Sequence, residues 1–119
     1  MSNQPNWTDD ELDLLNAIRA GKTVVVNMRK KGHPRFWAWA KANDLAVRID
    51  RKSKWGNPYT IGTDGDRDEV LRKYGVHLWH TPRLVVDARA LRGKALGCWC
   101  KPDGCHGDTL ARLSEVDDQ

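Results

Sequence analysis

Residues 94–106 have the sequence Lys-Ala-Leu-Gly-Cys-Trp-Cys-Lys-Pro-Asp-Gly-Cys-His. The first five residues form a short apolar run, which predicts a buried strand. Proline, aspartate and glycine at 102–104 favour a turn, and the last helix is expected over residues 107–115. Strand alternation places the two cysteines that flank Trp99 on one side and Trp99 on the other. The segment therefore predicts a strand, a turn and a helix, with cysteines where they join.

Strand and helix signals alternate through the rest of the chain. The β-branched run at 22–26 predicts a second buried strand, and residues 45–49 predict a third. Strands separated by helices indicate a small single α/β domain, with a short, mostly parallel sheet flanked by helices. The other elements expected are helices over 35–43, 66–80 and 82–91 and a short strand over 59–61.

The two ends of the chain differ in character from this domain. Residues 1–21 predict an appended N-terminal helix, because a capping box at 8–11 precedes leucine and isoleucine at helical spacing. The α/β domain itself is expected over residues 22–115. Residues 116–119 form an acidic tail.

Composition and length predict a soluble cytoplasmic protein. A chain of 119 residues can bury one modest core. No stretch is long and apolar enough to cross a membrane, and the acidic residues near the start are unlike a signal peptide. Three cysteines cannot all pair, and Cys98 and Cys100 are too close for good disulfide geometry. Reduced thiols in a cytoplasm-like compartment are therefore expected.

Basic and aromatic residues are concentrated in residues 22–60. This segment holds ten basic and two acidic side chains, in a chain whose net charge is +4. Cations neutralise phosphates and aromatic faces stack on bases, so their interleaving favours contact with a nucleotide or nucleic acid. The alternative is a solvated basic face with tryptophans in the core.

Three cysteines and one histidine lie close together near the C-terminus, namely Cys98, Cys100, Cys105 and His106. Their role has three interpretations. These are zinc-ligand types, although their spacing is tighter than in common zinc motifs. Alternatively, Cys105 is a reactive thiol at a helix N-terminus, assisted by His106. The third interpretation is packing as small apolar residues. Asp108 either caps the last helix or orients His106, so Cys105, His106 and Asp108 are the candidate catalytic residues.

A second set of residues is expected to bind a ligand, and it comprises Asn27, Arg29, Arg51, Trp55 and Asn57. The arginines suit phosphate, Trp55 suits stacking and the asparagines can orient a ligand. The carboxyl ends of parallel strands open on one edge of a sheet, where ligands bind in α/β folds. One pocket shared with the cysteine and histidine residues is therefore expected. The alternatives are solvated loop residues and a structural corner in which Trp55 fills the core.

Three motifs in this sequence are together similar to those of a known family. The motifs are Asn27-x-Arg29, Arg51-x-Ser-x-Trp55-Gly-Asn-Pro58 and Cys98-Trp-Cys100-x-Pro102-x-x-Cys105-His106-x-Asp108. They resemble domain of unknown function 4326, found in bacteriophages and bacteria. The resemblance spans about residues 23–115. It implies a protein of the bacterial cytoplasm, or of the host cell if phage-encoded, and it names no reaction. Members often have Ile-Gly-Arg where this chain has Ile49-Asp50-Arg51.

The leading hypothesis is a pocket that binds a nucleotide, a nucleobase or the end of a nucleic acid and processes it enzymatically. A zinc ion or a thiol would contribute to the chemistry. A first alternative is a nucleic-acid-binding module without enzymatic activity, in which the cysteines or zinc only stabilise the fold. A second is a phage protein that binds a host protein through the tryptophan-rich helix at 34–43.

Overall fold

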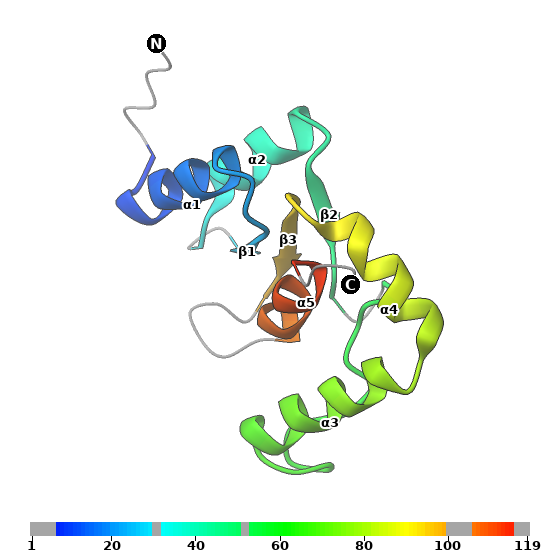
Figure 1. Cartoon of the computed structure of the whole chain (residues 1–119). Helices are drawn as coiled ribbons and strands as arrows, with labels where there is room; N and C mark the ends of the chain where they lie inside the picture. Colours follow the sequence, from blue (N-terminus) through cyan, green and yellow to red (C-terminus); the bar gives the residue numbers. More distant parts are fainter. Residues whose placement is uncertain (1–6, 30–31, 51–52, 100–105, 116–119) are drawn as a thin grey trace.

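A parallel sheet of order β1-β3-β2 lies at the centre of the structure (Figure 1). The structure is a computed structural model that describes residues 7–29, 32–50, 53–99 and 106–115. Within these residues the sheet has three strands, which are β1 (Val24–Asn27), β2 (Ala46–Arg48) and β3 (Ala95–Cys98). Both outer strands run parallel to β3, which confirms the predicted small α/β fold with a short parallel sheet.

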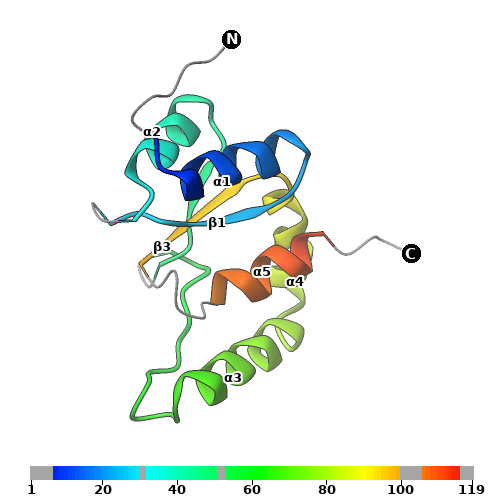
Figure 2. The same cartoon turned by 90° about the vertical axis from the view of Figure 1, so that its left-hand side faces the viewer.

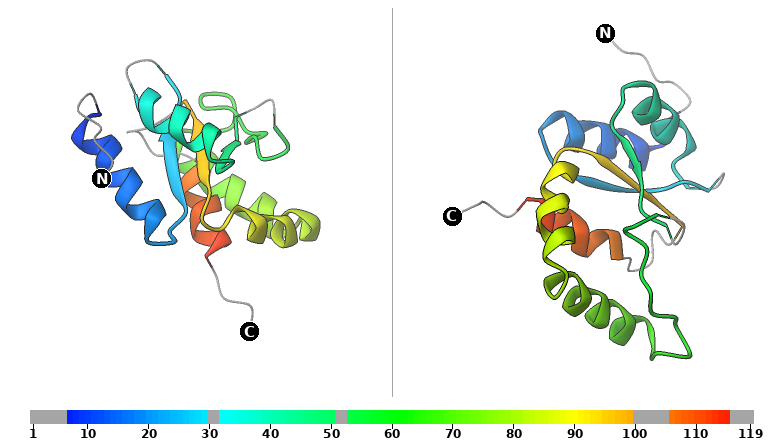
Figure 3. Two further views of the ribbon diagram at one scale, coloured as in Figure 1. Left: turned by 90° about the horizontal axis from the view of Figure 1, so that it is seen from above. Right: turned by 90° about the vertical axis from the view of Figure 1, so that its right-hand side faces the viewer.

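Helices cover both faces of the sheet (Figure 2). One face carries α1 (Asp9–Arg19) and α2 (Pro34–Ala42). On the other face α5 (His106–Ser114) lies against the sheet, and α3 (Arg67–Trp79), α4 (Pro82–Ala88) and the 3-10 turn η1 (Arg89–Leu91) pack around it. The right-hand view of Figure 3 shows the same layers from another side. None of the described helices is both long and apolar enough to span a membrane.

The central strand β3 supplies both cores. Leu96 and Cys98 pack with Leu110 of α5 in the core beneath the sheet. Ala95 belongs to the core formed with α1 and α2, and Trp99 follows on that second face. The predicted alternation is therefore confirmed for Cys98 and Trp99, because successive side chains of a strand point to opposite faces.

The strand expected over residues 59–61 is wrong. The Thr60 N–H donates to the Asp64 carboxylate at 2.8 Å, and the Asp64 N–H donates to the Thr60 carbonyl at 2.8 Å. These local hydrogen bonds close a turn, so the backbone groups are not available to a strand neighbour.

Glu11 joins α1 to α2. It forms the predicted capping box with Thr8, but its fully buried carboxylate also reaches the start of α2. Glu11 Oε2 accepts hydrogen bonds from the N–H groups of Arg35 at 2.7 Å and Phe36 at 2.8 Å. The N-cap residue of α2 provides no side-chain hydrogen bond of its own. Glu11 therefore satisfies α2 donors that would otherwise be left unpaired.

Glu11→Gln is expected to lower the free energy of unfolding by about 2–3 kcal/mol, since a neutral amide replaces a carboxylate that accepts several hydrogen bonds. Asp10→Asn is the matched control, because Asp10 is exposed in the same helical turn and should cost less than about 1 kcal/mol. Urea denaturation measures both values. Equal losses in the two variants would contradict the role given to Glu11.

Candidate functional site

A pocket of about 470 Å³ opens on the face of the sheet that α2 covers. It combines two indole rings, two cationic side chains and two smaller apolar residues. The lining residues are Met28, Trp37, Lys41, Ala46, Arg48 and Trp99.

The register of the sheet brings the pocket residues together. Asn27 pairs with Cys98, so the residues that follow them, Met28 and Trp99, leave the sheet at the same level. The Met28 N–H donates to the Cys98 carbonyl at 2.9 Å, which extends the pairing by one step. Arg48 ends β2. The pocket therefore lies over the α2 face of β2 and β3 and reaches the carboxyl ends of the strands, the edge where α/β folds bind ligands.

The absence of a side chain at Gly97 lets α2 approach the central strand. A Cβ at Gly97 would lie 2.7 Å from Sδ of Met28 and 2.8 Å from Cζ3 of Trp37. Trp37 is consequently only 9% exposed. Lys41 lies one helical turn further along α2, on the same side as Trp37. This close packing forms one wall of the pocket.

Asp50 holds two of the lining side chains. Its Oδ2 accepts a hydrogen bond from Nε1 of Trp99 at 3.2 Å and pairs with the Arg48 guanidinium. Burial acts to raise the pKa of Asp50, but the hydrogen bonds from Arg48 and Trp99 and the charge of Arg48 outweigh it. The pKa is therefore lowered below its ordinary value, and Asp50 is ionised at neutral pH.

Two of the predicted ligand-binding residues, Trp55 and Asn57, lie on the α3 side of the molecule. Trp55 is buried in the core beneath the sheet, and its carbonyl accepts a hydrogen bond from the Tyr74 hydroxyl at 2.6 Å. Asn57 donates to the Val70 carbonyl at 3.3 Å and accepts from the Tyr59 N–H at 2.9 Å. These contacts correspond to the structural corner considered as the alternative, on the face opposite the pocket.

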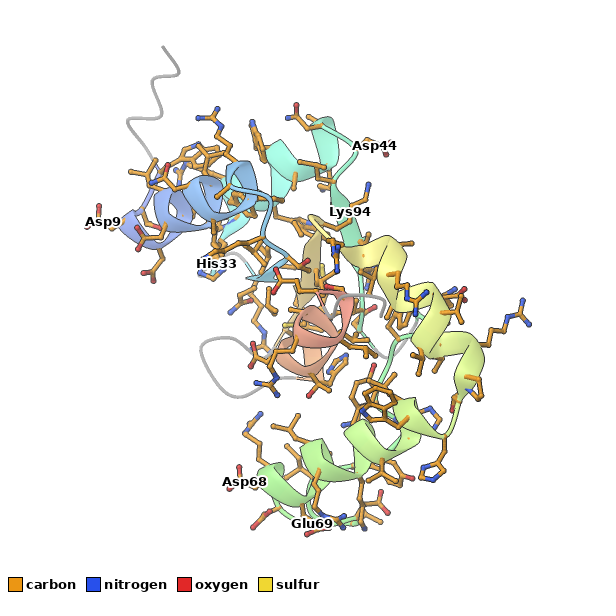
Figure 4. All side chains as sticks on the ribbon, viewed as in Figure 1. Asp9, His33, Asp44, Asp68, Glu69 and Lys94 are labelled. Atoms are coloured by element: carbon orange, nitrogen blue, oxygen red, sulfur yellow. The ribbon has the colours of Figure 1, made fainter. Side chains whose placement is uncertain are left out.

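Asn27 organises the turn between β1 and α2. Its backbone N–H donates to Nδ1 of His33 at 3.0 Å, and its side-chain oxygen accepts from the Arg29 N–H at 2.9 Å. Figure 4 labels His33 beside β1. The Arg29 side chain is exposed, whereas Arg51 lies outside the described residues.

The predicted zinc and thiol residues are described only in part. Cys98 is a buried, unbridged thiol, while Cys100 and Cys105 lie outside the described residues. Within the part that is described, no group of three or more histidine, cysteine, aspartate or glutamate residues could hold a metal ion. Zinc binding and a reactive Cys105 stay predictions.

His106 begins α5 and is buried. Its Nε2 lies 2.6 Å from the Ile49 carbonyl oxygen, and its ring meets Tyr74 edge-on with 5.0 Å between centroids. A carbonyl only accepts hydrogen bonds, so Nε2 carries the proton and a metal could be bound only through Nδ1. Asp108 lies in the first turn of α5, where the helix dipole favours a carboxylate.

The pocket was not predicted as a unit, although parts of its pattern are present in the sequence. Alternation along the strands predicts that Trp99 points to the other face of the sheet from Cys98, and that Arg48 points to the other face from Val47. Trp37 and Lys41 are four residues apart, which puts them on one face of a helix. The register of β2 against β3 and the packing of Trp37 on Gly97 join these separate signals.

A comparison with protein families identifies the chain. Residues 29–116 match the domain of unknown function DUF4326. The chain belongs to the DUF4326 family. This confirms the resemblance seen in the sequence motifs.

Two uncharacterized viral proteins are similar in sequence to this DUF4326 chain. An uncharacterized 12.4 kDa protein in the nrdA-td intergenic region of Enterobacteria phage T4 is 36% identical over 60% of this chain and 68% of its own length. The uncharacterized protein R718 of Acanthamoeba polyphaga mimivirus is 35% identical over 54% of this chain. The match spans 55% of the mimivirus protein. No solved structure matches the chain.

Gly97→Ala is expected to lower the free energy of unfolding by about 1–3 kcal/mol, because the added methyl group would overpack the contact with Trp37 and Met28. Gly75→Ala is the control, since nothing lies within 4 Å of a Cβ at that position in α3. It should raise stability by about 0.5–1 kcal/mol. Thermal and urea unfolding measure both, and wild-type stability in Gly97→Ala would contradict the close packing of α2.

Proposed function

We propose that the pocket binds a nucleotide or the end of a nucleic-acid strand. The observation that carries the proposal is the joint presence of Trp37, Trp99, Lys41 and Arg48 around a single hollow of about 470 Å³. This volume falls within the range of about 300–1,000 Å³ typical of small-molecule sites. A ligand with both a planar aromatic ring and an anionic group matches this lining.

Each side chain has a distinct role in this proposal. Trp99 is 42% exposed and offers a face on which a base can stack. Trp37 is nearly buried and provides the fixed wall opposite the solvent. Lys41 is exposed, and the Arg48 side chain is 53% exposed, so both cations can meet a phosphate without full desolvation.

The distribution of charge along the chain supports an anionic ligand. Lys41 and Arg48 belong to the segment 22–60, in which basic side chains outnumber acidic ones by ten to two. An electrostatic contribution of this kind draws phosphate groups toward the pocket and weakens as salt is added.

Processing of the bound nucleotide by Cys105, His106 and Asp108 extends the proposal. This chemistry would require the ligand to reach past the carboxyl edge of the sheet, because His106 begins α5 on the other face and contacts the carbonyl of Ile49, the residue before Asp50. Liquid chromatography of nucleotides incubated with the protein tests for new products. Turnover by the wild type that is lost in Cys105→Ala supports an enzyme, whereas binding without any turnover favours a binding module.

Binding is measured by titrating the protein with the four ribonucleoside 5′-monophosphates and with a 5′-phosphorylated oligothymidylate, following tryptophan fluorescence. Saturable quenching is expected. Trp99→Ala should weaken binding at least about fivefold, since stacking contributes roughly 1–3 kcal/mol per base. Lys41→Glu should weaken it to a similar degree by repelling the phosphate.

Lys22→Glu is the matched control for charge. Lys22 is exposed just before the amino end of β1 and does not line the pocket, so its reversal should change the affinity by less than about twofold if the local cation matters. Absence of binding to every probe would overturn the proposal. Equal losses in Lys22→Glu and Lys41→Glu would also overturn it, since they would show attraction by net charge only.

A further inference from the structure

We propose that Asp50 is the positioning residue of this pocket, which fixes Trp99 and Arg48 in the arrangement that the ligand meets. The inference rests on the proposed function and extends it to a residue that does not line the pocket. One carboxylate oxygen, Oδ2, is shared by the Trp99 indole N–H and the Arg48 guanidinium. The stacking group and one phosphate-binding group are thereby tied to the same atom.

The exposures of the three side chains show which one anchors the others. Asp50 is 6% exposed, whereas Trp99 and Arg48 reach into solvent. Long exposed side chains lose rotamer freedom when they bind a ligand. A buried partner that restrains them beforehand reduces this loss, so the ligand meets a site that is already ordered.

The backbone around Asp50 is fixed from several directions. The Ile49 N–H donates to the Gly97 carbonyl of β3 at 3.0 Å, and the Ile49 carbonyl accepts from His106 of α5. The Asp50 carbonyl accepts from the Ser53 N–H at 2.9 Å and from its hydroxyl at 2.8 Å. The carboxylate therefore projects from a backbone segment that β3, α5 and the following turn all hold.

The second carboxylate oxygen indicates that Asp50 serves more than folding. Oδ1 of Asp50 is the one buried side-chain oxygen or nitrogen without a hydrogen-bond partner in the described part of the chain. Glu11 shows the contrasting structural case, in which both oxygens accept backbone N–H groups. A buried carboxylate oxygen without a hydrogen-bond partner costs folding free energy, and we attribute its retention to the positioning of Trp99 and Arg48.

Two variants separate the contributions of Asp50. Asp50→Ala removes the acceptor for both partners, and it is expected to weaken nucleoside monophosphate binding at least about tenfold. Asp50→Asn keeps an oxygen that can accept from the indole but loses the charge facing Arg48, so its affinity should lie between Asp50→Ala and the wild type. Trp99→Phe keeps a ring but lacks the indole N–H. Added to Asp50→Ala, it should cause much less than its separate loss, because coupled residues are not additive.

A spectroscopic measurement reports the positioning without any ligand. Protein labelled with 5-fluorotryptophan gives a 19F signal for Trp99, which is assigned by its disappearance in Trp99→Phe. Asp50→Ala should shift that signal, Asp50→Asn should shift it less, and both should leave the Trp55 signal in place. Ser114→Ala is the control, because it removes a buried hydroxyl that bonds to Thr23 on the far side of the sheet; it should lower stability while preserving affinity and the Trp99 signal.

The outcomes distinguish this inference from the proposed function. Wild-type binding with unchanged affinity in both Asp50 variants overturns the positioning role and leaves the proposed function standing. An unshifted Trp99 signal in folded Asp50→Ala also overturns the positioning role. Failure of the wild type to bind any of the nucleotides overturns both.

Discussion

Trp37 of α2 packs directly on the backbone of Gly97, in the middle of the central strand. Both outer strands hydrogen-bond to this strand, so its position sets the level at which all three strands end. The tryptophan fixes how closely α2 approaches the sheet, and Lys41 follows one turn later on the same helix. The pocket at the carboxyl edge is a consequence of this contact combined with the parallel register.

On the opposite face of the sheet a glycine also allows a helix to pack closely on the strands. A Cβ at Gly107, near the start of α5, would lie 2.7 Å from Cδ1 of Ile49 and 2.9 Å from Cγ1 of Val25. The helix therefore lies close to the strands, and His106 reaches the carbonyl of Ile49. Glycine on the strand brings α2 to one face, and glycine on the helix brings α5 to the other. Close approach on both sides buries every residue of the central strand β3.

Local sequence patterns were sufficient to predict most elements but not the site. Apolar periodicity located the strands and helices, and the capping box located α1, because these signals act over a few residues. The pairing of Asp50 with Trp99 joins residues 49 positions apart, and no local pattern specifies it. Trp55 has both a structural and a ligand-binding interpretation from the sequence, and the contacts that favour the structural one come from Tyr74 of α3, 19 positions away. The family could be predicted from the sequence because each of its motifs is a short continuous stretch of residues.

The central claim is that ligands meet the α2 face of the sheet rather than the face that contains Trp55. The most direct measurement is a titration of 15N-labelled protein with a nucleoside 5′-monophosphate, following the indole N–H signals of the six tryptophans. We expect saturable shifts of the Trp99 and Trp37 signals, with the Trp55 signal unmoved. Shifts confined to Trp55, with Trp37 and Trp99 unchanged, would contradict it.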